Sequence, residues 1–464
     1  MSATLQDRLQ RLRRPPSAEN GPPVGPSELE RLERALVGEA PDALSLKARL
    51  ERLVAAAARG RSRAPVPRPV PLEEMVQGLR VENARGEFFL MESEAHLESF
   101  HGDAPLSRFR AIAPGAVAIL TGEPDLAGFD LASAVFLDTE TTGLAGGTGT
   151  AAFLIGIGFV DGDRFRVRQY FMRDYHEEPA LLAGLAEDLA RFHHLVTFNG
   201  RMFDVPLLET RYRLSRDRFP LADAPHLDLL HPARRLWKAR LESCRLQSLE
   251  DGLLGLRRRG DVPGEEIPQI YFEWVRRRDG RALARVFEHN RLDVISLAAL
   301  AVLACRWVEE GWADDPRDAY SLARVLDRAQ LPERAEVFYR RTLESDPMTD
   351  PGYRVAALLR LAARARRTGD WERAEALWSE AAEAGALEAL RALAILREHR
   401  ERDFGSALAA VERALALLAA SGDPRSGRTV EGFLRRRRRL LGKLAGASGV
   451  SPGSPPAGTP PRPG

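Results

Sequence analysis

Residues 134–143 read Ala-Val-Phe-Leu-Asp-Thr-Glu-Thr-Thr-Gly, and this stretch decides the fold class. Its four leading apolar residues predict a buried strand, and the polar residues after them mark the end of that strand. Because side chains alternate along a strand, Asp138 and Glu140 emerge on the same face. Two such carboxylates need a neutralising cation, and oxygen ligands suit Mg²⁺ or Mn²⁺. The alternative is a polar strand end in a turn, which a lone Asp-x-Glu would favour.

The pattern after this strand predicts an α/β domain. Apolar runs over residues 151–160 and 165–172 flank the short polar turn Asp161-Gly162-Asp163, which predicts an antiparallel hairpin. Helical spacing over 178–192, an apolar strand over 194–198 and a helix over 205–214 follow. The order strand, hairpin, helix, strand, helix predicts an α/β domain with a mixed sheet.

Three more residues that suit metal or proton chemistry lie downstream. Asp204 opens a predicted helix, where in isolation it would cap the helix or complement its dipole. His289 and Asp293 are four residues apart in a helical stretch, so they share one helix face. For His289 alone, a surface or capping role is the alternative.

In this order and context, Asp138, Glu140, Asp204 and Asp293 resemble the four acids of the DEDD (DnaQ-like) 3′ to 5′ exonucleases, which have a ribonuclease H-like fold. The chain is most similar to the bacterial YprB-like branch of that superfamily. The resemblance covers residues 71 to 312. It is supported by the strand over Thr150 to Gly158, by Phe198-Asn199-Gly200 with Phe203-Asp204, by His226-Leu227-Asp228-Leu229, and by Asp261-Val262-Pro263-Gly264 followed by Tyr271.

The mechanism that this resemblance implies is two-metal hydrolysis of phosphodiester bonds. The four acids would hold two Mg²⁺ or Mn²⁺ ions, of which one activates water and the other stabilises the leaving oxygen. His289 would be the general base, since imidazole titrates near working pH. The tyrosine-type branch has Tyr four residues before the last Asp, and the histidine-type branch has His five before it. This chain departs from both patterns, with His289 at four residues and Glu288 at five.

The resemblance also implies substrate contacts at Thr141, Asn199 and Phe203. Asn199 is equally explained as a turn residue, and Phe203 could stack on a base, although an aromatic residue at a helix start is more often part of the core. Asp228 follows an apolar run and suits either a supporting role in the site or a cap. The run Arg257-Arg258-Arg259 suits contact with a phosphate backbone or a solvated face.

A chain of 464 residues is longer than a single domain with one hydrophobic core usually is, so several domains are expected. Proline, glycine and strand signals predict the following order. A Pro-rich, partly disordered arm spans 1–70, a small lead-in subdomain with β elements 71–130, the ribonuclease H-like domain 131–312, tetratricopeptide-like helical repeats 313–445, and a disordered tail 446–464.

The helical repeats are predicted from a recurring pattern of small and large residues. Ala335, Tyr339 and Thr342 recur as Ala374, Trp378 and Ala381 and as Ala407, Val411 and Ala414. The offsets are 39 residues (335 to 374) and 33 residues (374 to 407), close to the period of about 34 residues in tetratricopeptide helix pairs. An irregular helical bundle with chance alanines is the alternative.

Charge, cysteine content and hydrophobic runs limit the partners and the cellular compartment that the sequence predicts. The chain has 68 Lys and Arg against 66 Asp and Glu, with basic clusters at 232–260 and 422–446 that suit a polyanion or a solvated face. Two cysteines build neither a disulfide framework nor a zinc site of usual spacing. No unbroken apolar run of membrane-spanning length and no secretory signal occur, so we expect a cytoplasmic protein without a membrane partner.

The sequence therefore predicts a metal-dependent nuclease, acting as a 3′ to 5′ exonuclease on single-stranded or frayed DNA or RNA. The helical repeats would offer a groove for a protein partner or for extended nucleic acid. One alternative is a scaffold whose nuclease-like domain is inert or only holds nucleic acid. Another is an endonuclease, either structure-specific or cutting hybrids internally, because end selection depends on loops rather than on the fold.

Overall fold

The computed structural model of the chain describes residues 68–143, 149–344, 351–421 and 427–447. The predicted N-terminal arm, apart from its last three residues, lies outside these ranges. The predicted tail does too, apart from Gly446 and Ala447, which end the last helix.

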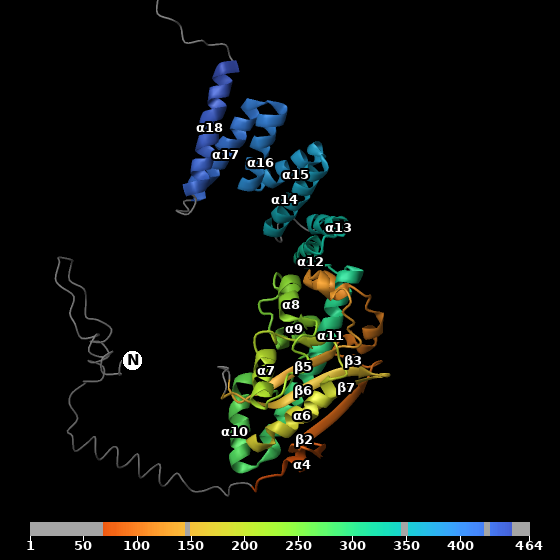
Figure 1. Ribbon diagram of the computed structural model, residues 1–464. Coiled ribbons are helices and arrows are strands. Elements are labelled where there is room, and N and C mark those ends of the chain that lie inside the picture. Colours follow the sequence, from red (N-terminus) through yellow and green to blue (C-terminus); the bar gives the residue numbers. More distant parts are fainter. Residues whose placement is uncertain (1–67, 144–148, 345–350, 422–426, 448–464) are drawn as a thin grey trace, which may run out of the picture. The chain divides into compact units, whose positions relative to one another are not determined.

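Seven strands form one mixed sheet, as the sequence predicted (Figure 1). They are β1 (Gly78–Asn83), β2 (Gly86–His96), β5 (Val135–Thr141), β6 (Ala152–Asp161), β7 (Arg164–Phe171), β8 (Leu195–Thr197) and β9 (His226–Asp228). Their order across the sheet is β1-β2-β7-β6-β5-β8-β9. β5 pairs in parallel with β8 and β8 with β9, whereas the other pairs are antiparallel. Two short strands, β3 (Phe100–His101) and β4 (Ala104–Pro105), pair separately.

The N-terminal hairpin belongs to this sheet. The structure differs here from the expected lead-in subdomain over 71–130, because β2 pairs with β7 and extends the sheet by two strands. Phe88 and Phe89 of β2 are buried, and their rings pack against Tyr170 and Phe171 of β7. The hairpin thus covers an edge strand and completes the core.

Helices of the first part of the chain surround the sheet. They are α4 (Leu72–Met75), α5 (Ala116–Thr121), α6 (Glu178–Leu189), α7 (Asp204–Leu214), α8 (Leu230–Trp237), α9 (Leu246–Leu253), α10 (Ile267–Arg277) and α11 (Gly280–Glu310), with short 3₁₀ turns η1 (Leu106–Ala111), η2 (Pro124–Leu126), η3 (Tyr175–Glu177) and η4 (Gly264–Glu266). The longest is α11, with 31 residues. Asp279 caps its start by accepting a hydrogen bond from the Arg281 amide, and Gly311 ends it in the left-handed conformation.

Two glycines of β6 let α11 approach the sheet closely. A Cβ atom on Gly156 would lie 2.3 Å from Asn290 Oδ1, and one on Gly158 would lie 2.5 Å from Val294 Cγ1. Gly156 lies opposite Asp138 in the β5–β6 register, so both residues belong to the face that α11 covers. The glycines therefore place helix α11 directly over the strand end that carries the acids.

The C-terminal part of the chain is an all-α helical repeat domain. Its helices are α12 (Pro316–Arg328), α13 (Pro332–Leu343), α14 (Pro351–Thr368), α15 (Trp371–Glu383), α16 (Leu387–Leu396) with the π-turn η5 (Arg397–Glu401), α17 (Phe404–Ser421) and α18 (Gly427–Ala447). All nine residues of the repeating pattern are buried, on α13, α15 and α17. The predicted small-large-small spacing thus marks the core-facing side of every second helix.

Among the described residues, one helix is long and apolar enough to cross a membrane by length and composition alone. This helix, α17, packs between α16 and α18 and buries Ala407, Val411 and Leu418 in the core of the repeats. Repeat packing therefore accounts for the buried part of α17, which is 28% of its 18 residues.

We predict that Gly156→Ala disrupts the candidate site more than it disrupts the fold. The added methyl group would displace Asn290 and with it the helix above Asp138, at about 1–3 kcal/mol of unfolding free energy. Denaturant unfolding and metal titration measure the two effects. Gly128→Ala, where a Cβ meets no atom within 4 Å, is the control. Unchanged metal affinity in Gly156→Ala would contradict the proposed role of the close approach.

Candidate active site

Asp138 and Glu140 lie at the end of β5 on the face covered by α11. Asn290 of α11 donates a hydrogen bond of 2.8 Å from Nδ2 to Asp138 Oδ2. The fully buried Gln169 of β7 in turn donates to Asn290 Oδ1 at 2.8 Å, which fixes the orientation of the Asn290 amide. A chain of amides from the sheet thus holds the Asp138 carboxylate in place.

Asp204 contacts the same strand. It occupies the first turn of α7 and is 8% exposed. Thr139, which alternates with the two acids of β5, donates a hydrogen bond of 2.5 Å to Asp204 Oδ1. The start of α7 is therefore tied to the strand end that carries Asp138 and Glu140.

His289 and Asp293 face Glu140 from successive turns of α11. His289 Nε2 lies 3.9 Å from Glu140 Oε1 and 3.4 Å from Asp293 Oδ2. Ligand atoms of these three residues all lie within 4.8 Å of one another. Glu288, the residue at the alternative position, instead pairs with Arg291 away from this group. The four-residue spacing therefore brings the histidine into the site.

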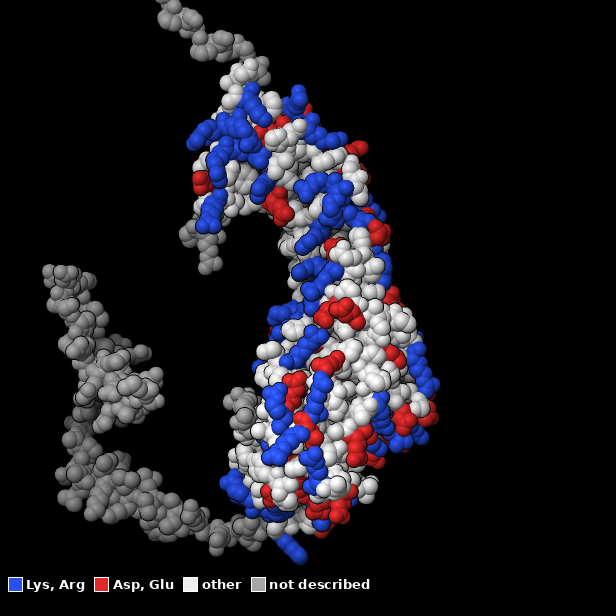
Figure 2. Space-filling model, in the orientation of Figure 1, with Lys and Arg blue, Asp and Glu red and all other residues white. Residues whose placement is uncertain are grey.

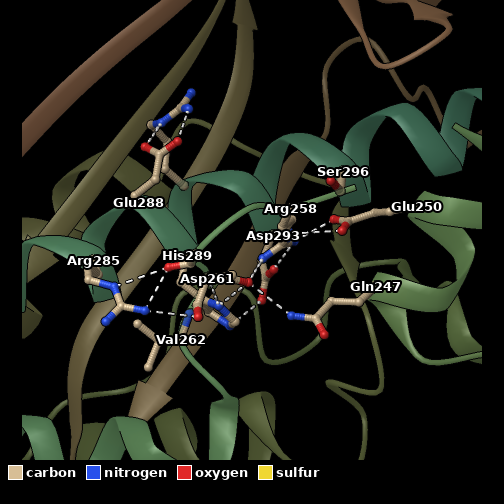
Figure 3. A network of polar contacts seen from close by, with 12 residues as sticks. Gln247, Glu250, Arg258, Asp261, Val262, Arg285, Glu288, His289, Asp293 and Ser296 are labelled. Carbon is tan, nitrogen blue, oxygen red and sulfur yellow. Dashed lines mark hydrogen bonds and ion pairs between the residues drawn. The ribbon is translucent and has the colours of Figure 1, made fainter. Parts of the chain in front are cut away.

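The imidazole of His289 is held by Asp261 (Figure 3). His289 Nδ1 lies 2.8 Å from one Asp261 carboxylate oxygen and 2.9 Å from the other. The loop that carries Asp261 is fastened to α11 by Arg285, which donates to the carbonyl oxygens of Gly260 and Asp261. Because Nδ1 is occupied by a carboxylate, Nε2 is the nitrogen that faces Glu140 and Asp293.

Arg258 supplies the site with a buried positive charge. Its side chain is 5% exposed and contacts the carboxylates of Glu250 and Asp293, with a longer contact of 3.2 Å to Asp261 Oδ2 (Figure 3). Arg257 next to it is largely exposed and pairs with Asp251. The expectation that the Arg257–Arg259 run tracks a phosphate backbone or faces solvent is thus wrong for Arg258, because the loop turns this residue inward toward buried acids.

Burial and mutual repulsion raise the pKa values of the acids. Burial, followed by the charges of Asp293 and Asp204, raises the pKa of Asp138 well above its usual range. Burial and the charge of Asp138 do the same to the pKa of Glu140. Burial raises the pKa of Asp204 to about 6, against the hydrogen bond from Thr139. Burial also raises the pKa of Asp293, although Arg258 opposes the shift. The cluster therefore carries more negative charge than its surroundings neutralise.

The donor set fits a hard divalent cation. Carboxylate oxygens from two elements and an imidazole converge around Glu140, and the acids are crowded enough to resist ionisation without a cation. Oxygen ligands with one nitrogen suit Mg²⁺ or Mn²⁺, and their binding would relieve the repulsion that raises the pKa values. The charge and the donor atoms of this site would therefore suit such an ion.

Comparisons with known proteins agree with this fold. Residues 135–305 match the model of the RNase_H superfamily (RNase_H_2). Over 296 residues, 62% of this chain and 70% of the relative, the chain is 33% identical to "Uncharacterized protein YprB" of Bacillus subtilis (strain 168). The chain belongs to the YprB family of the ribonuclease H superfamily. Membership of this superfamily indicates a nuclease, a hydrolase of phosphodiester bonds.

The three predicted substrate-contact residues of this YprB-family chain lie near the acids in sequence, at the end of β5 and in the loop between β8 and α7. Thr141 at the end of β5 donates to the Gly143 carbonyl at 3.0 Å. Asn199 adopts a left-handed conformation in the loop after β8, where its amide donates to Asp228 at 2.7 Å. Phe203 precedes α7 and is 59% exposed, so its interpretation as a core residue is wrong. The first turn of α7 directs this ring to solvent because Asp204 takes the buried position.

Asp228 combines both roles that the sequence suggested. Its carboxylate accepts hydrogen bonds from the amides of Asn199 and Arg201 and from the amide of Leu230 at the start of α8. It therefore shapes the loop beside Asp204 and caps the next helix at once.

Sequence reasoning did not single out Asn290, Arg258 or Glu250, and it treated Asp261 only as part of a matching motif. Asn290 follows His289 directly, and Asp261 opens the quoted Asp-Val-Pro-Gly motif, so a signal existed for both. For Arg258 and Glu250 no local signal distinguishes them from their charged neighbours. Only the folded loop shows that both side chains are buried.

We predict that Arg258→Ala destabilises the protein by about 3–5 kcal/mol, because Glu250 then loses the cation that it is buried against. Urea unfolding of the metal-free protein measures this free energy. Arg257→Ala, in the adjacent exposed residue, is the matched control and leaves the midpoint unchanged. Equal behaviour of the two variants would contradict a structural role for the buried arginine.

We predict that Asp204→Asn stabilises the metal-free protein at pH 7.5. The folded pKa near 6 lies above the unfolded value, so the unfavourable contribution of this carboxylate appears as pH rises from about 4 to 6 and is complete above that range. The gain, about 1–3 kcal/mol at pH 7.5, should therefore shrink as pH falls through 6.

Thermal unfolding of both proteins at several pH values measures this difference, which includes the relief of the repulsion that Asp204 exerts on Asp138 and Glu140. Saturating Mn²⁺ should reverse the order by stabilising the wild-type protein more than the variant. A wild-type protein that is the more stable one at pH 7.5 without metal would show that Asp204 is not held at a cost.

Proposed function

We propose that this protein is a metal-dependent 3′ to 5′ exonuclease of the DEDD type that acts on single-stranded or frayed nucleic acid. The observation that carries the proposal is the cluster of Glu140, Asp293 and an oriented imidazole, whose ligand atoms lie within 4.8 Å of one another. Asp138 and Asp204 lie near enough for their charges to act on the same acids. The proposed helical repeats of the tetratricopeptide type form a second part of the chain, available to a protein partner or to nucleic acid.

The four carboxylates would hold two Mg²⁺ or Mn²⁺ ions. Bound there, the ions would lower the pKa of a water molecule and neutralise charge that develops on the leaving oxygen. The protein contributes the fixed positions of the ligands: Asn290 orients Asp138, Thr139 orients Asp204 and Arg258 orients Asp293. These contacts keep the carboxylates close despite their repulsion.

His289 acts in this proposal as the general base. Its Nε2 atom faces the acids and accepts a proton from the attacking water, while the bond from Nδ1 to Asp261 fixes the tautomer and stabilises the imidazolium that results. Asp261 is therefore a positioning residue. In this proposal Phe203, which is exposed next to Asp204, would stack on a terminal base, and Asn199 of the preceding loop would contact the same strand.

The test is degradation of 5′-labelled single-stranded DNA and RNA by the purified protein with Mg²⁺, Mn²⁺ or EDTA. We expect metal-dependent ladders that shorten from the 3′ end, abolished by Asp138→Ala. His289→Ala should reduce the rate about 10²- to 10⁴-fold, the usual contribution of a general base. Arg257→Ala, outside the acid cluster, should retain full activity.

A closed circular single strand separates the possible outcomes. An exonuclease leaves it intact, whereas an endonuclease, the alternative on this fold, opens it. Activity that survives Asp138→Ala would refute the proposed site. Cleavage would then not depend on Asp138, the first acid of that site.

A second candidate function is favoured by one observation. Arg258 pairs with Asp293, so this carboxylate is neutralised without a metal ion, as a domain that binds nucleic acid without cutting it would allow. Binding of single strands without cleavage under any metal condition would support this inert holding domain. Metal-dependent cleavage lost in Asp138→Ala would exclude it.

A further inference from the structure

A groove with a volume of about 1120 Å³ lies between α8 of the nuclease domain and helices α12 and α14 of the repeats. Seven arginines and lysines line it, against Asp327 as the one acid among its lining residues. We call this feature the basic groove. Six of its cations have exposed side chains: Arg234, Lys238, Arg324, Arg328, Arg360 and Arg367.

Helical spacing aligns these cations along the groove. Arg234 and Lys238 are four residues apart on α8, Arg324 and Arg328 are four apart on α12, and Arg360 and Arg367 are seven apart on α14. Residues at such spacings share one face of a helix, and all six side chains are exposed. Three helices thus direct a stripe of positive charge into the same space, in the region where Figure 2 shows Lys and Arg side chains gathered over α8, α12 and α14.

The six cations lack carboxylate partners within the described chain, unlike the other basic clusters. On α18, Arg436, Arg439 and Lys443 all contact the buried Glu398. In the 257–259 run, Arg257 and Arg258 are both committed to acids. Among the residues that the structure describes, no carboxylate forms an ion pair with any of the six groove cations.

Like charges are crowded in the groove as a result. Burial, followed by the positive charge of Arg328, lowers the pKa of Arg235 on α8. The guanidinium of Arg235 donates to the Thr121 carbonyl at 2.8 Å and so fastens α8 to α5. The fold therefore holds together a set of repelling cations that a polyanion would neutralise.

Aromatic side chains lie among these charges. The ring of Tyr320 on α12 lies 5.3 Å from that of Tyr353 on α14 and 5.8 Å from that of Tyr339 on α13. Tyr339 is buried and donates to Asp327 at 2.8 Å, which also occupies the single acid of the groove. Tyr320 and Tyr353 are half-buried and present their remaining surface to the groove. Arginines interleaved with partly exposed tyrosines suit phosphates and bases together.

The groove begins at the same edge of the sheet as the acids. β5, β8 and β9 are parallel, so their carboxyl ends lie at one edge. Asp138 and Glu140 lie at that end of β5, and α8 starts two residues after β9, at the Asp228 cap. The groove helix α8 therefore begins at the sheet edge that carries the acids.

We propose that the basic groove binds the sugar-phosphate backbone of a single nucleic-acid strand beyond the part of that strand held in the active site. The inference rests on the proposed nuclease function and names where its substrate is held. The cations contact phosphates, and Tyr353 stacks on a base. An acidic protein segment is the competing occupant, which the aromatic rings and the shared sheet edge disfavour.

The test is binding of fluorescein-labelled single-stranded DNA and RNA to the full chain that carries Asp138→Asn, in EDTA, by polarisation across a salt series. Arg324→Glu with Arg328→Glu should weaken binding about tenfold or more and reduce the slope of log K against log salt by about 1.4, since each phosphate contact on a single strand contributes about 0.7. Tyr353→Ala should weaken binding, and Tyr353→Phe should restore it.

Arg391→Glu with Arg413→Glu is the matched control, because both arginines are exposed on α16 and α17 and lie outside the groove. Circular dichroism establishes that all variants fold. Unchanged affinity and salt slope in the Arg324/Arg328 variant would overturn the proposal. The proposal would also be overturned if polyglutamate displaced the labelled strand as effectively as an unlabelled strand does at the same concentration of negative charge.

Cleavage assays distinguish failure of this inference from failure of the proposed function. With the Asp138 side chain intact, the groove variants should cleave a dinucleotide at the wild-type rate but lose activity on long strands through a higher KM. If the wild-type protein cleaves no substrate but binds strands in a way that depends on Arg324 and Arg328, the proposed nuclease function is wrong and the proposed role of the groove stands. If the wild-type protein and the groove variants cleave long strands equally well, the proposed role of the groove is wrong and the proposed nuclease function stands.

Discussion

The close packing of α11 on the sheet is the constraint on which the site depends. Gly156 and Gly158 leave no side chain between β6 and the helix, so Asn290 and Val294 contact the strand directly. The same approach places His289 and Asp293 within reach of Glu140. A larger residue at either glycine would move every α11 contribution to the site together, because one rigid helix carries them all.

Charge balance is the second requirement, and the protein meets only part of it. Arg258 offsets Glu250 and Asp293, and Asp261 is balanced by Arg258 and by its contact with His289, which lowers the pKa of Asp261 although burial opposes this. Asp138 and Glu140 form no ion pair with an arginine or lysine in the described chain, and their pKa values are raised. The imbalance is thus confined to the strand end, where a divalent ion would be held by ligands already in position.

The parts of the site that follow from local patterns could be predicted from the sequence. Strand alternation places Asp138 and Glu140 on one face, and the four-residue spacing places His289 with Asp293. The parts that depend on chain segments far apart could not be predicted. Arg258 reaches Asp293 across 35 residues of sequence, and the β1–β2 hairpin joins β7 through side chains whose pattern equally suited a separate subdomain.

The distribution of positive charge shows most clearly what could not be predicted from the sequence. Counted along the sequence, residues 232–260 and 422–446 are the basic clusters, and they look alike. In the structure, Glu398 neutralises much of the second cluster, whereas Arg234 and Lys238 of the first face Arg324, Arg328 and residues of α14 that belong to no cluster. Local charge density therefore does not identify the polyanion site. What identifies it is the set of arginines that folding brings together without bringing carboxylates to them, since that repulsion reduces stability unless a ligand of opposite charge removes it.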